Sequence, residues 1–287
     1  MQALWMLLAS FLFACMGVCV KLAASTHSTA EIVAYRSVLS LLLMLALVRL
    51  RGVSLRTTHW RWQITRGFLG FLALFTFFWA ITHLSLATAV TLNYTSPIFL
   101  AILLAMAGAR LTTSSVISLL IGLFGVGLLL RPTLSADQLF DGLLGLVSGL
   151  LAGMAYYSVR ELGVRGEPDS RTVFYFALVS SVCASIWLLD SEIHPLDMHS
   201  GLQLLGVAVF ATTAQLAMTH AYAGSQTLLA ASLAYSTVVF ASLFGIWLWN
   251  EAHDIGTWLA IGLVILSGVG ASQASRTRTV TDARSHF

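Results

Sequence analysis

Apolar residues recur along the chain in ten long runs, which short polar segments separate. The runs cover residues 4–24, 31–49, 66–84, 88–107, 113–131, 141–160, 171–189, 201–223, 226–248 and 255–273. A helix needs about 20 mostly apolar residues to cross a bilayer. The pattern therefore predicts an all-α integral membrane protein with ten transmembrane helices.

The first five runs match the second five almost without gaps. An offset of 139 residues pairs Leu7 with Leu146, Leu12 with Leu151, and Val20 with Val159. An offset of 141 residues pairs Ala73 with Ala214, Leu92 with Leu233, and Tyr94 with Tyr235. Because each copy holds an odd number of helices, the second copy must enter the membrane from the opposite side. We expect two inverted five-helix repeats around a central cavity, at residues 1–133 and 139–273, followed by a tail at 274–287.

Composition supports a membrane protein without a soluble domain. Hydrophobic residues make up 58% of the chain and charged residues only 9%, whereas soluble domains carry about 25% charged residues. No G-x-x-x-x-G-K-[ST] phosphate-binding loop is present, so an ATP-binding module within this chain is not expected. The first run starts without Lys or Arg and is too long for a signal peptide, which favours a spanning helix. Three cysteines within the runs predict buried thiols, with no metal site and no cofactor.

Basic residues predict the orientation of the chain in the membrane. Twelve of them fall on one side, at Arg49, Arg51, Arg56, Arg61, Arg66, Arg110, Arg160, Arg165, Arg171, Arg276, Arg278 and Arg284. Only Lys21, Arg36 and Arg131 fall on the other side. Since Lys and Arg are retained in the cytoplasm, both termini are expected there, in a multi-pass protein of the cytoplasmic (inner) membrane. The net charge of +3 then reflects topology, not nucleic-acid binding.

The fourth run contains the one proline that lies inside a predicted helix. Pro97 lacks an amide hydrogen, and its ring displaces the carbonyl group of Asn93 four residues earlier. The helix should bend here and leave a backbone acceptor beside Asn93, Tyr94 and two hydroxyls, which would suit a polar solute. A packing kink satisfied by Thr95 or Ser96 is an equal alternative. Tyr235, in the matching segment of the second half, is a further candidate for substrate binding.

Other polar and aromatic residues within the runs are also candidates for substrate binding. They are Phe75 and Trp79 in the third run, Tyr156 and Tyr157 in the sixth, and Gln215 and His220 in the eighth. Buried polar side chains in membranes usually face the interior of the helix bundle. Structural bonds between helices would explain Gln215 and His220 equally well. Gly145, Gly149 and Gly153 predict a smooth helix face for close packing.

Charged residues are sparse within the runs, and none is expected at the middle of the bilayer. Arg36 is expected near the outer end of the second helix and Glu251 near the outer end of the ninth. Together with Arg110 they are candidates for gating or coupling. Only His220 and Glu251 could take part in a proton relay, so both proton coupling and facilitated exchange stay open.

Several motifs resemble the EamA family of the drug/metabolite transporter superfamily. The first half carries Phe78-Trp79-Ala80 and the segment 92–97, and the second half carries Gln215 to Tyr222, the segment 233–235 and Glu251. The resemblance covers residues 4–273 and implies ten helices around a cavity that moves amino acids, other metabolites or drugs, often outward. Members usually end the fourth helix with Gly-Glu, whereas this chain has Ala109-Arg110. Paired roles for two glutamates are therefore not expected here.

These observations predict a secondary transporter (permease) and not an enzyme. It would move a small organic metabolite, such as an amino acid, across the cytoplasmic membrane by alternating access, with export favoured. Alternatives are uptake or exchange of a larger metabolite resembling a nucleoside, a vitamin or S-adenosylmethionine, or an intramembrane enzyme. The expected partners are the substrate and the lipid bilayer, without nucleic acid, in a monomer or weak homo-oligomer.

Overall fold

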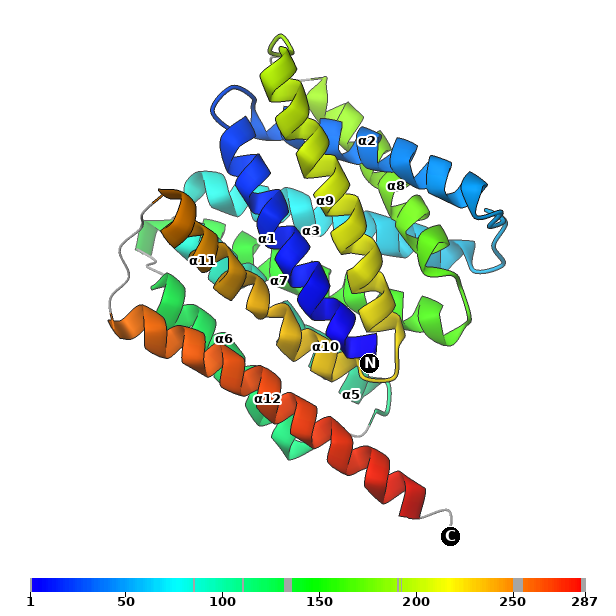
Figure 1. Cartoon of the computed structure of the whole chain (residues 1–287), viewed down its shortest axis with the longest axis vertical. Coiled ribbons are helices and arrows are strands. Elements are labelled where there is room, and N and C mark those ends of the chain that lie inside the picture. Colours follow the sequence, from blue (N-terminus) through cyan, green and yellow to red (C-terminus); the bar gives the residue numbers. More distant parts are fainter. Residues whose placement is uncertain are drawn as a thin grey trace.

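The computed structural model describes residues 2–84, 86–109, 111–131, 136–189, 191, 193–249 and 255–284, and within these residues the regular structure is helical (Figure 1). The first half contains η1 (Gln2–Leu4), α1 (Trp5–Ala23), α2 (Thr29–Leu50), α3 (Trp60–His83), α4 (Leu86–Asn93), α5 (Ser96–Met106) and α6 (Thr113–Leu130). The second half contains η2 (Ala136–Gln138), α7 (Leu139–Val164), α8 (Asp169–Leu188), α9 (Met198–Ala223), α10 (Thr227–Ala234), α11 (Ser236–Trp249) and α12 (Ile255–Arg284).

Ten candidate membrane spans are present among the described residues, which confirms the all-α membrane fold. The third span differs most from its predicted bounds, because α3 starts at Trp60 and not at residue 66. The polar residues between 60 and 66 interrupt the apolar pattern, but they are part of the first turns of α3. The sequence placed Arg66 at the first residue of this run and counted it with the adjoining basic region, whereas it lies in the second turn of α3.

The fourth span is broken where the sequence predicted a bend. Helix α4 ends at Asn93 and α5 begins at Ser96, with Pro97 in the first turn of α5, where a missing amide hydrogen costs no helical bond. The hydroxyl of Thr95 donates to the Leu92 carbonyl at 2.6 Å. This bond goes to the carbonyl of Leu92 and not to that of Asn93, the carbonyl that Pro97 was expected to displace.

The ninth span breaks at the matching position without a proline. Helix α10 ends at Ala234 and α11 begins at Ser236, whose hydroxyl donates to the Leu233 carbonyl at 2.6 Å. Leu233 and Ser236 are the repeat partners of Leu92 and Thr95 at the offset of 141. A side-chain hydroxyl bonded three residues back is therefore the feature that both breaks share.

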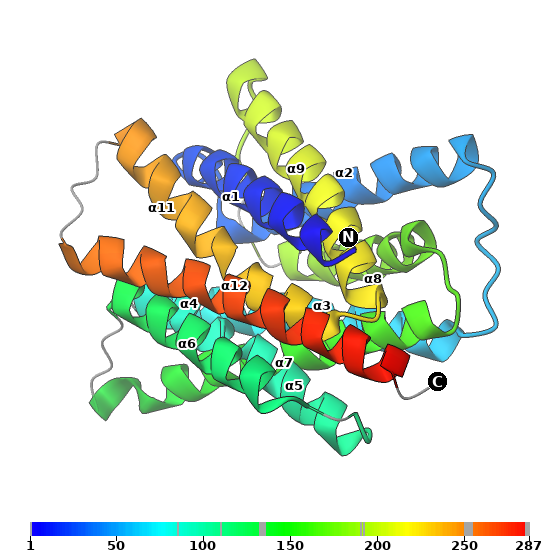
Figure 2. The ribbon, with the colours of Figure 1, turned by 60° about the horizontal axis from the view of Figure 1, so that its bottom comes forward.

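The most extensive helix contacts join the two halves of the chain. Helix α3 packs against α7 and α1 packs against α9, so each third helix of a half lies on the first helix of the other half. Helices α2 and α8 also pack together, as do α6 and α12, which run side by side in Figures 1 and 2. If each helix is replaced by its counterpart in the other half, the same set of helix pairs results. The arrangement surrounds the middle of the bundle with residues from both halves.

Candidate functional site

A cavity of about 210 Å³ lies between α1, α2, α3 and α4 of the first half and α7, α8 and α9 of the second. Most of its lining is apolar, with rings from Phe13, Phe77 and Phe78 and aliphatic side chains of α1 and α2. Five residues bring polar groups to it, namely Arg36, Arg66, Asn93, Tyr156 and Gln215. Four of these five were candidates from the sequence, and the fold brings them together in one place.

Asn93 reaches the cavity because it is the last residue of α4 before the break. Its side-chain amide donates to the hydroxyl of Ser148 at 3.0 Å, and that hydroxyl donates to the Gly145 carbonyl at 2.6 Å. Gly149 lies directly against the break, where an added Cβ would come within 2.3 Å of the Thr95 Oγ1 atom. The predicted glycine face of α7 is therefore confirmed as a close-packing surface, and it fixes the position of Asn93.

Arg66 is the cavity residue that the sequence analysis missed. It is only 2% exposed, and its guanidinium lies 4.4 Å from the centre of the Phe176 ring. Gly70, one turn further along α3, makes room for it, since an added Cβ would come within 2.3 Å of the Arg66 Nη1 atom. Glycines at positions 67 and 70, on the same face of a helix that starts at Trp60, are the sequence signal that could have located it.

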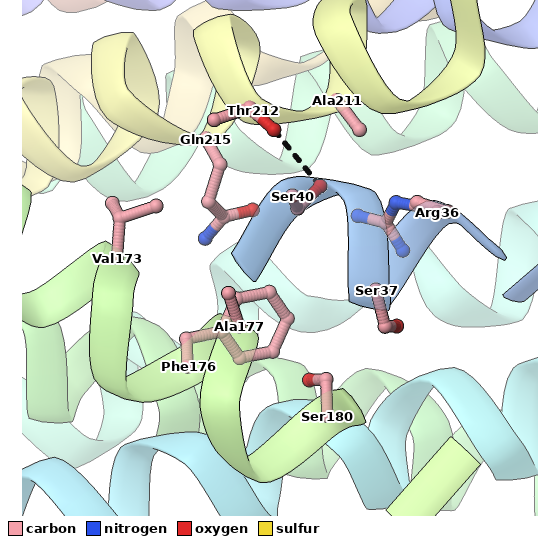
Figure 3. A pocket seen from close by; sticks show the side chains of 10 residues that line it. All are labelled: Arg36, Ser37, Ser40, Val173, Phe176, Ala177, Ser180, Ala211, Thr212 and Gln215. Atoms are coloured by element: carbon pink, nitrogen blue, oxygen red, sulfur yellow. Dashed lines mark hydrogen bonds between the residues drawn. The ribbon is translucent and has the colours of Figure 1, made fainter. Parts of the chain in front are cut away.

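Arg36 also contributes a guanidinium to the cavity instead of remaining at a helix end. It lies in the second turn of α2, and its Nε atom is buried without a hydrogen-bond partner among the described residues. Gln215 of α9, which is 6% exposed, lines a smaller adjoining pocket together with Arg36 (Figure 3). A hydrogen bond of 2.8 Å from Thr212 to Ser40 joins α9 to α2 beside this pocket.

Tyr156 completes the polar lining from α7. Its ring stacks on that of Tyr222 with centroids 4.7 Å apart, which holds the phenol in place. No Asp or Glu lines the cavity within the part of the chain that the structure describes. The site can therefore offer cationic, amide and phenol donors to a solute, together with aromatic surface.

Four sequence candidates lie away from this cavity and have other contacts. Trp79 donates from Nε1 to Asp141 at 3.1 Å, and Phe75 packs edge-on against Trp187. Tyr157 packs near Trp62, while the Nδ1 atom of His220 lies 2.7 Å from an Asp169 oxygen. Each of these four residues contacts a side chain of another helix, so each contact joins two helices.

Tyr94, Pro97 and Tyr235 pack in the protein core beside the two helix breaks. The rings of Tyr94 and Tyr235 lie 6.1 Å apart, and Tyr235 is fully buried. Pro97 is buried in the first turn of α5. The remaining two candidates, Arg110 and Glu251, lie outside the described residues.

Two buried carboxylates join the halves at opposite ends of α2. The Glu31 cluster comprises Glu31, His27 and His194; Glu31 accepts from the His194 backbone at 2.6 Å and lies 2.9 Å from its ring. The Glu167 cluster comprises Glu167, Thr57, His59, Gln63 and Arg171. In the Glu31 cluster, the connection that follows α8 meets the start of α2. In the Glu167 cluster, the connection that follows α2 meets the start of α8.

Electrostatics favour the ionised form of Glu167. Burial by itself would raise the pKa of this carboxyl, but hydrogen bonds from Thr57, Arg171 and His59 together lower its pKa below the usual 4.5. Arg171 also donates from Nε to the Ser54 carbonyl at 2.8 Å. The Glu167 cluster thus ties the α2–α3 connection to α8.

Ten apolar helices around a cavity that both halves line form the architecture of a membrane transporter. The model of the EamA-like transporter family matches residues 1–131 and again residues 141–272. The chain belongs to this family, and it is therefore a multi-pass membrane transporter of the drug/metabolite type.

Several named transporters are similar to this chain in sequence over most of their length. The pseudopaline exporter CntI of Pseudomonas aeruginosa is 29% identical over 270 residues, covering 94% of this chain and 95% of the relative. A riboflavin transporter of Vibrio cholerae is 24% identical, covering 92% of this chain and 90% of its own. A solved crystal structure with 18% identity covers 96% of this chain and 98% of its own with a TM-score of 0.82, which shows the fold alone.

Proposed function

We propose that this chain is a secondary transporter of the cytoplasmic membrane that moves a small organic metabolite by alternating access. The observation that carries the proposal is the cavity, because both halves line it and its five polar residues come from five different helices. Polar side chains inside a membrane protein are expensive to bury, and they commonly mark a substrate pathway. Here they converge on a single cavity.

The two halves are proposed to be inverted repeats with both termini in the cytoplasm. Support comes from two observations. The first helix of each half packs against the third helix of the other half, and both broken spans contain a hydroxyl, of Thr95 or Ser236, that donates to the carbonyl three residues earlier. An even number of spans returns the chain to the side where it started. The excess of basic residues on that side supports the cytoplasmic assignment.

Export is the direction that we favour. The relative from Pseudomonas aeruginosa, which is similar to this chain over nearly its whole length, is named as an exporter. A carrier for a larger, vitamin-like metabolite is the second candidate, because two relatives are named as riboflavin transporters. The two candidates differ in cargo, and a binding screen separates them.

The test is a thermal-shift screen of the detergent-purified protein with amino acids, nucleosides, riboflavin and amines, followed by counterflow in reconstituted vesicles with each compound that binds. Compounds that bind the folded form raise its melting temperature by mass action. We expect Asn93→Ala to abolish flux without loss of folded protein, because this change removes a polar group of the cavity. Flux at the wild-type rate in Asn93→Ala vesicles would contradict the assignment of the site.

A further inference from the structure

We propose that the transported solute is an organic anion whose negatively charged group binds between Arg36 and Arg66. This inference rests on the proposed transport function and specifies the chemistry of its cargo. The two guanidiniums come from different helices, α2 and α3, and both line the same cavity.

Neither arginine has an anionic partner within the described part of the protein. The Nε atoms of both side chains are buried and make no hydrogen bond there, and no ion pair of either residue is present. Glu31, on the same helix as Arg36, is already engaged by His27, Ser28 and His194. The protein thus leaves the hydrogen-bonding capacity of a buried cation, Arg66, and a half-buried one, Arg36, largely unused.

This arrangement is unfavourable unless an anion binds. A buried charge loses its hydration, and two like charges in one cavity also repel each other. The ring of Phe176 stabilises the Arg66 guanidinium through its π face, but it accepts no conventional hydrogen bond. An oxyanion would accept hydrogen bonds from both guanidiniums and neutralise their charge, because guanidinium geometry matches carboxylate and phosphate groups.

The rest of the cavity fits the organic part of such a solute. Tyr156, Asn93 and Gln215 supply neutral polar groups, and Gln215 makes no hydrogen bond to any described residue. Rings of Phe77 and Phe78 supply an apolar surface on the α3 side. The chemistry points to a metabolite that combines a carboxylate or phosphate group with an apolar portion.

The experiment uses the full-length protein in detergent and a metabolite extract of the expressing cells. Ion exchange separates the extract into anionic, neutral and cationic fractions, and part of the anionic fraction is treated with phosphatase. Melting temperatures are measured with each fraction for the wild type, Arg36→Gln, Arg66→Gln and Arg66→Lys. Arg49→Gln on α2 and Arg61→Gln on α3 are matched controls, because both arginines are exposed on the same two helices.

We expect the anionic fraction to raise the melting temperature of the wild type and of both controls. Arg36→Gln and Arg66→Gln should need at least about tenfold more of this fraction for the same shift, since a charged hydrogen bond is lost. Without added solute, both variants should melt at or above the wild-type temperature, because an unpaired charge has been removed from the lining of the cavity. Loss of the shift after phosphatase treatment identifies a phosphate ester, and its persistence identifies a carboxylate.

A shift produced by the neutral or cationic fraction alone, or an anionic shift that survives in both glutamine variants, would overturn the anion proposal while leaving transport intact. No shift with any fraction would count against the cavity as a solute site and so against both proposals. A lower melting temperature of unliganded Arg66→Gln would assign that guanidinium to packing. If this variant does not fold, Arg36→Gln and the charge-preserving Arg66→Lys still decide the outcome.

Discussion

Gln215 shows how a single polar residue in this protein can be assigned to the solute and not to the scaffold. Its amide lines both the cavity and the adjoining pocket, and it makes no hydrogen bond to a described residue. Such an amide is costly inside a membrane protein unless a solute or water satisfies it. His220, five residues nearer the end of α9, is instead engaged by Asp169.

Gln215→Ala should therefore weaken the apparent affinity for the transported solute while leaving the fold intact. Losing one neutral hydrogen bond raises the half-saturation concentration about three- to tenfold. The measurement is the concentration dependence of flux in reconstituted vesicles. Thr213→Ala is the matched control, because Thr213 is exposed on the same helix and its hydroxyl donates only to carbonyls of that helix, those of Val209 and Phe210. An unchanged half-saturation concentration in Gln215→Ala would remove this residue from the site.

We assign Tyr235 to the scaffold, because it is not among the residues that line the cavity. It is fully buried against Gly122 and Tyr94, and its hydroxyl has no hydrogen-bond partner among the described residues. Tyr235→Phe should keep transport and leave the melting temperature equal or higher, since an unsatisfied polar group is removed. Tyr235→Ala should destabilise the protein by about 3–5 kcal/mol, as other losses of buried rings do. Normal melting of Tyr235→Ala with lost flux would instead place the residue in the transport pathway.

At the scale of helices, the two broken spans show what the sequence could reveal about local structure. Pro97 predicted the break in the fourth span, and the structure confirms it between Asn93 and Ser96. The corresponding break at Tyr235 lacks a proline, so only the repeat alignment pointed to it. The hydrogen bonds of Thr95 and Ser236 could not be predicted, because hydroxyls three residues from a carbonyl are common in unbroken helices too.

Close packing of α7 against the first break depends on Gly149. An added Cβ there would come within 2.7 Å of the Leu92 carbonyl oxygen, which is backbone and cannot move aside freely. Gly149→Ala should therefore destabilise the protein by about 1–3 kcal/mol, in the range of overpacked cores. Gly17→Ala on α1 is the control, because nothing lies within 4 Å of an added Cβ there. Thermal unfolding in detergent compares the two variants, and equal melting temperatures would contradict the packing argument.

The Glu167 cluster should hold the connection between α2 and α3 in a pH-dependent way. The folded pKa of Glu167 lies below its usual 4.5, because hydrogen bonds outweigh the effect of burial. Stabilisation by this carboxylate is therefore complete well above pH 4.5 and is lost as the pH falls through the lowered folded pKa. Hydrogen exchange of amides 51–59, corrected for the intrinsic pH dependence, should begin to accelerate as the pH falls below 4.5 and should be fastest below the lowered folded pKa. In Glu167→Gln the same amides should exchange rapidly at every pH.

At the scale of the whole molecule, the sequence predicted the fold better than the site. Length and apolarity fixed ten spans, but helices in lipid carry apolar residues on all sides, so their rotation about their own axes is poorly encoded. Trp79 and His220 therefore looked equivalent to Tyr156 and Gln215, although only the latter pair line the cavity. Packing between the halves decides which face points inward, and a single sequence does not display it.

The Glu31 and Glu167 clusters offer a test of alternating access, because they join the halves at opposite ends of α2. If one end must open while the other stays closed, weakening each cluster should expose the cavity to a different side of the membrane. A cysteine at the cavity residue Met218, in a background with the three native cysteines replaced, reports this exposure to membrane-impermeant maleimides. Glu31→Gln should increase labelling several-fold from the side of Thr29, and Glu167→Gln should increase it from the side of Leu50. Increases from the same side in both variants would mean that the clusters stabilise the fold without controlling access, and the two ends of the bundle would then have to open by another route.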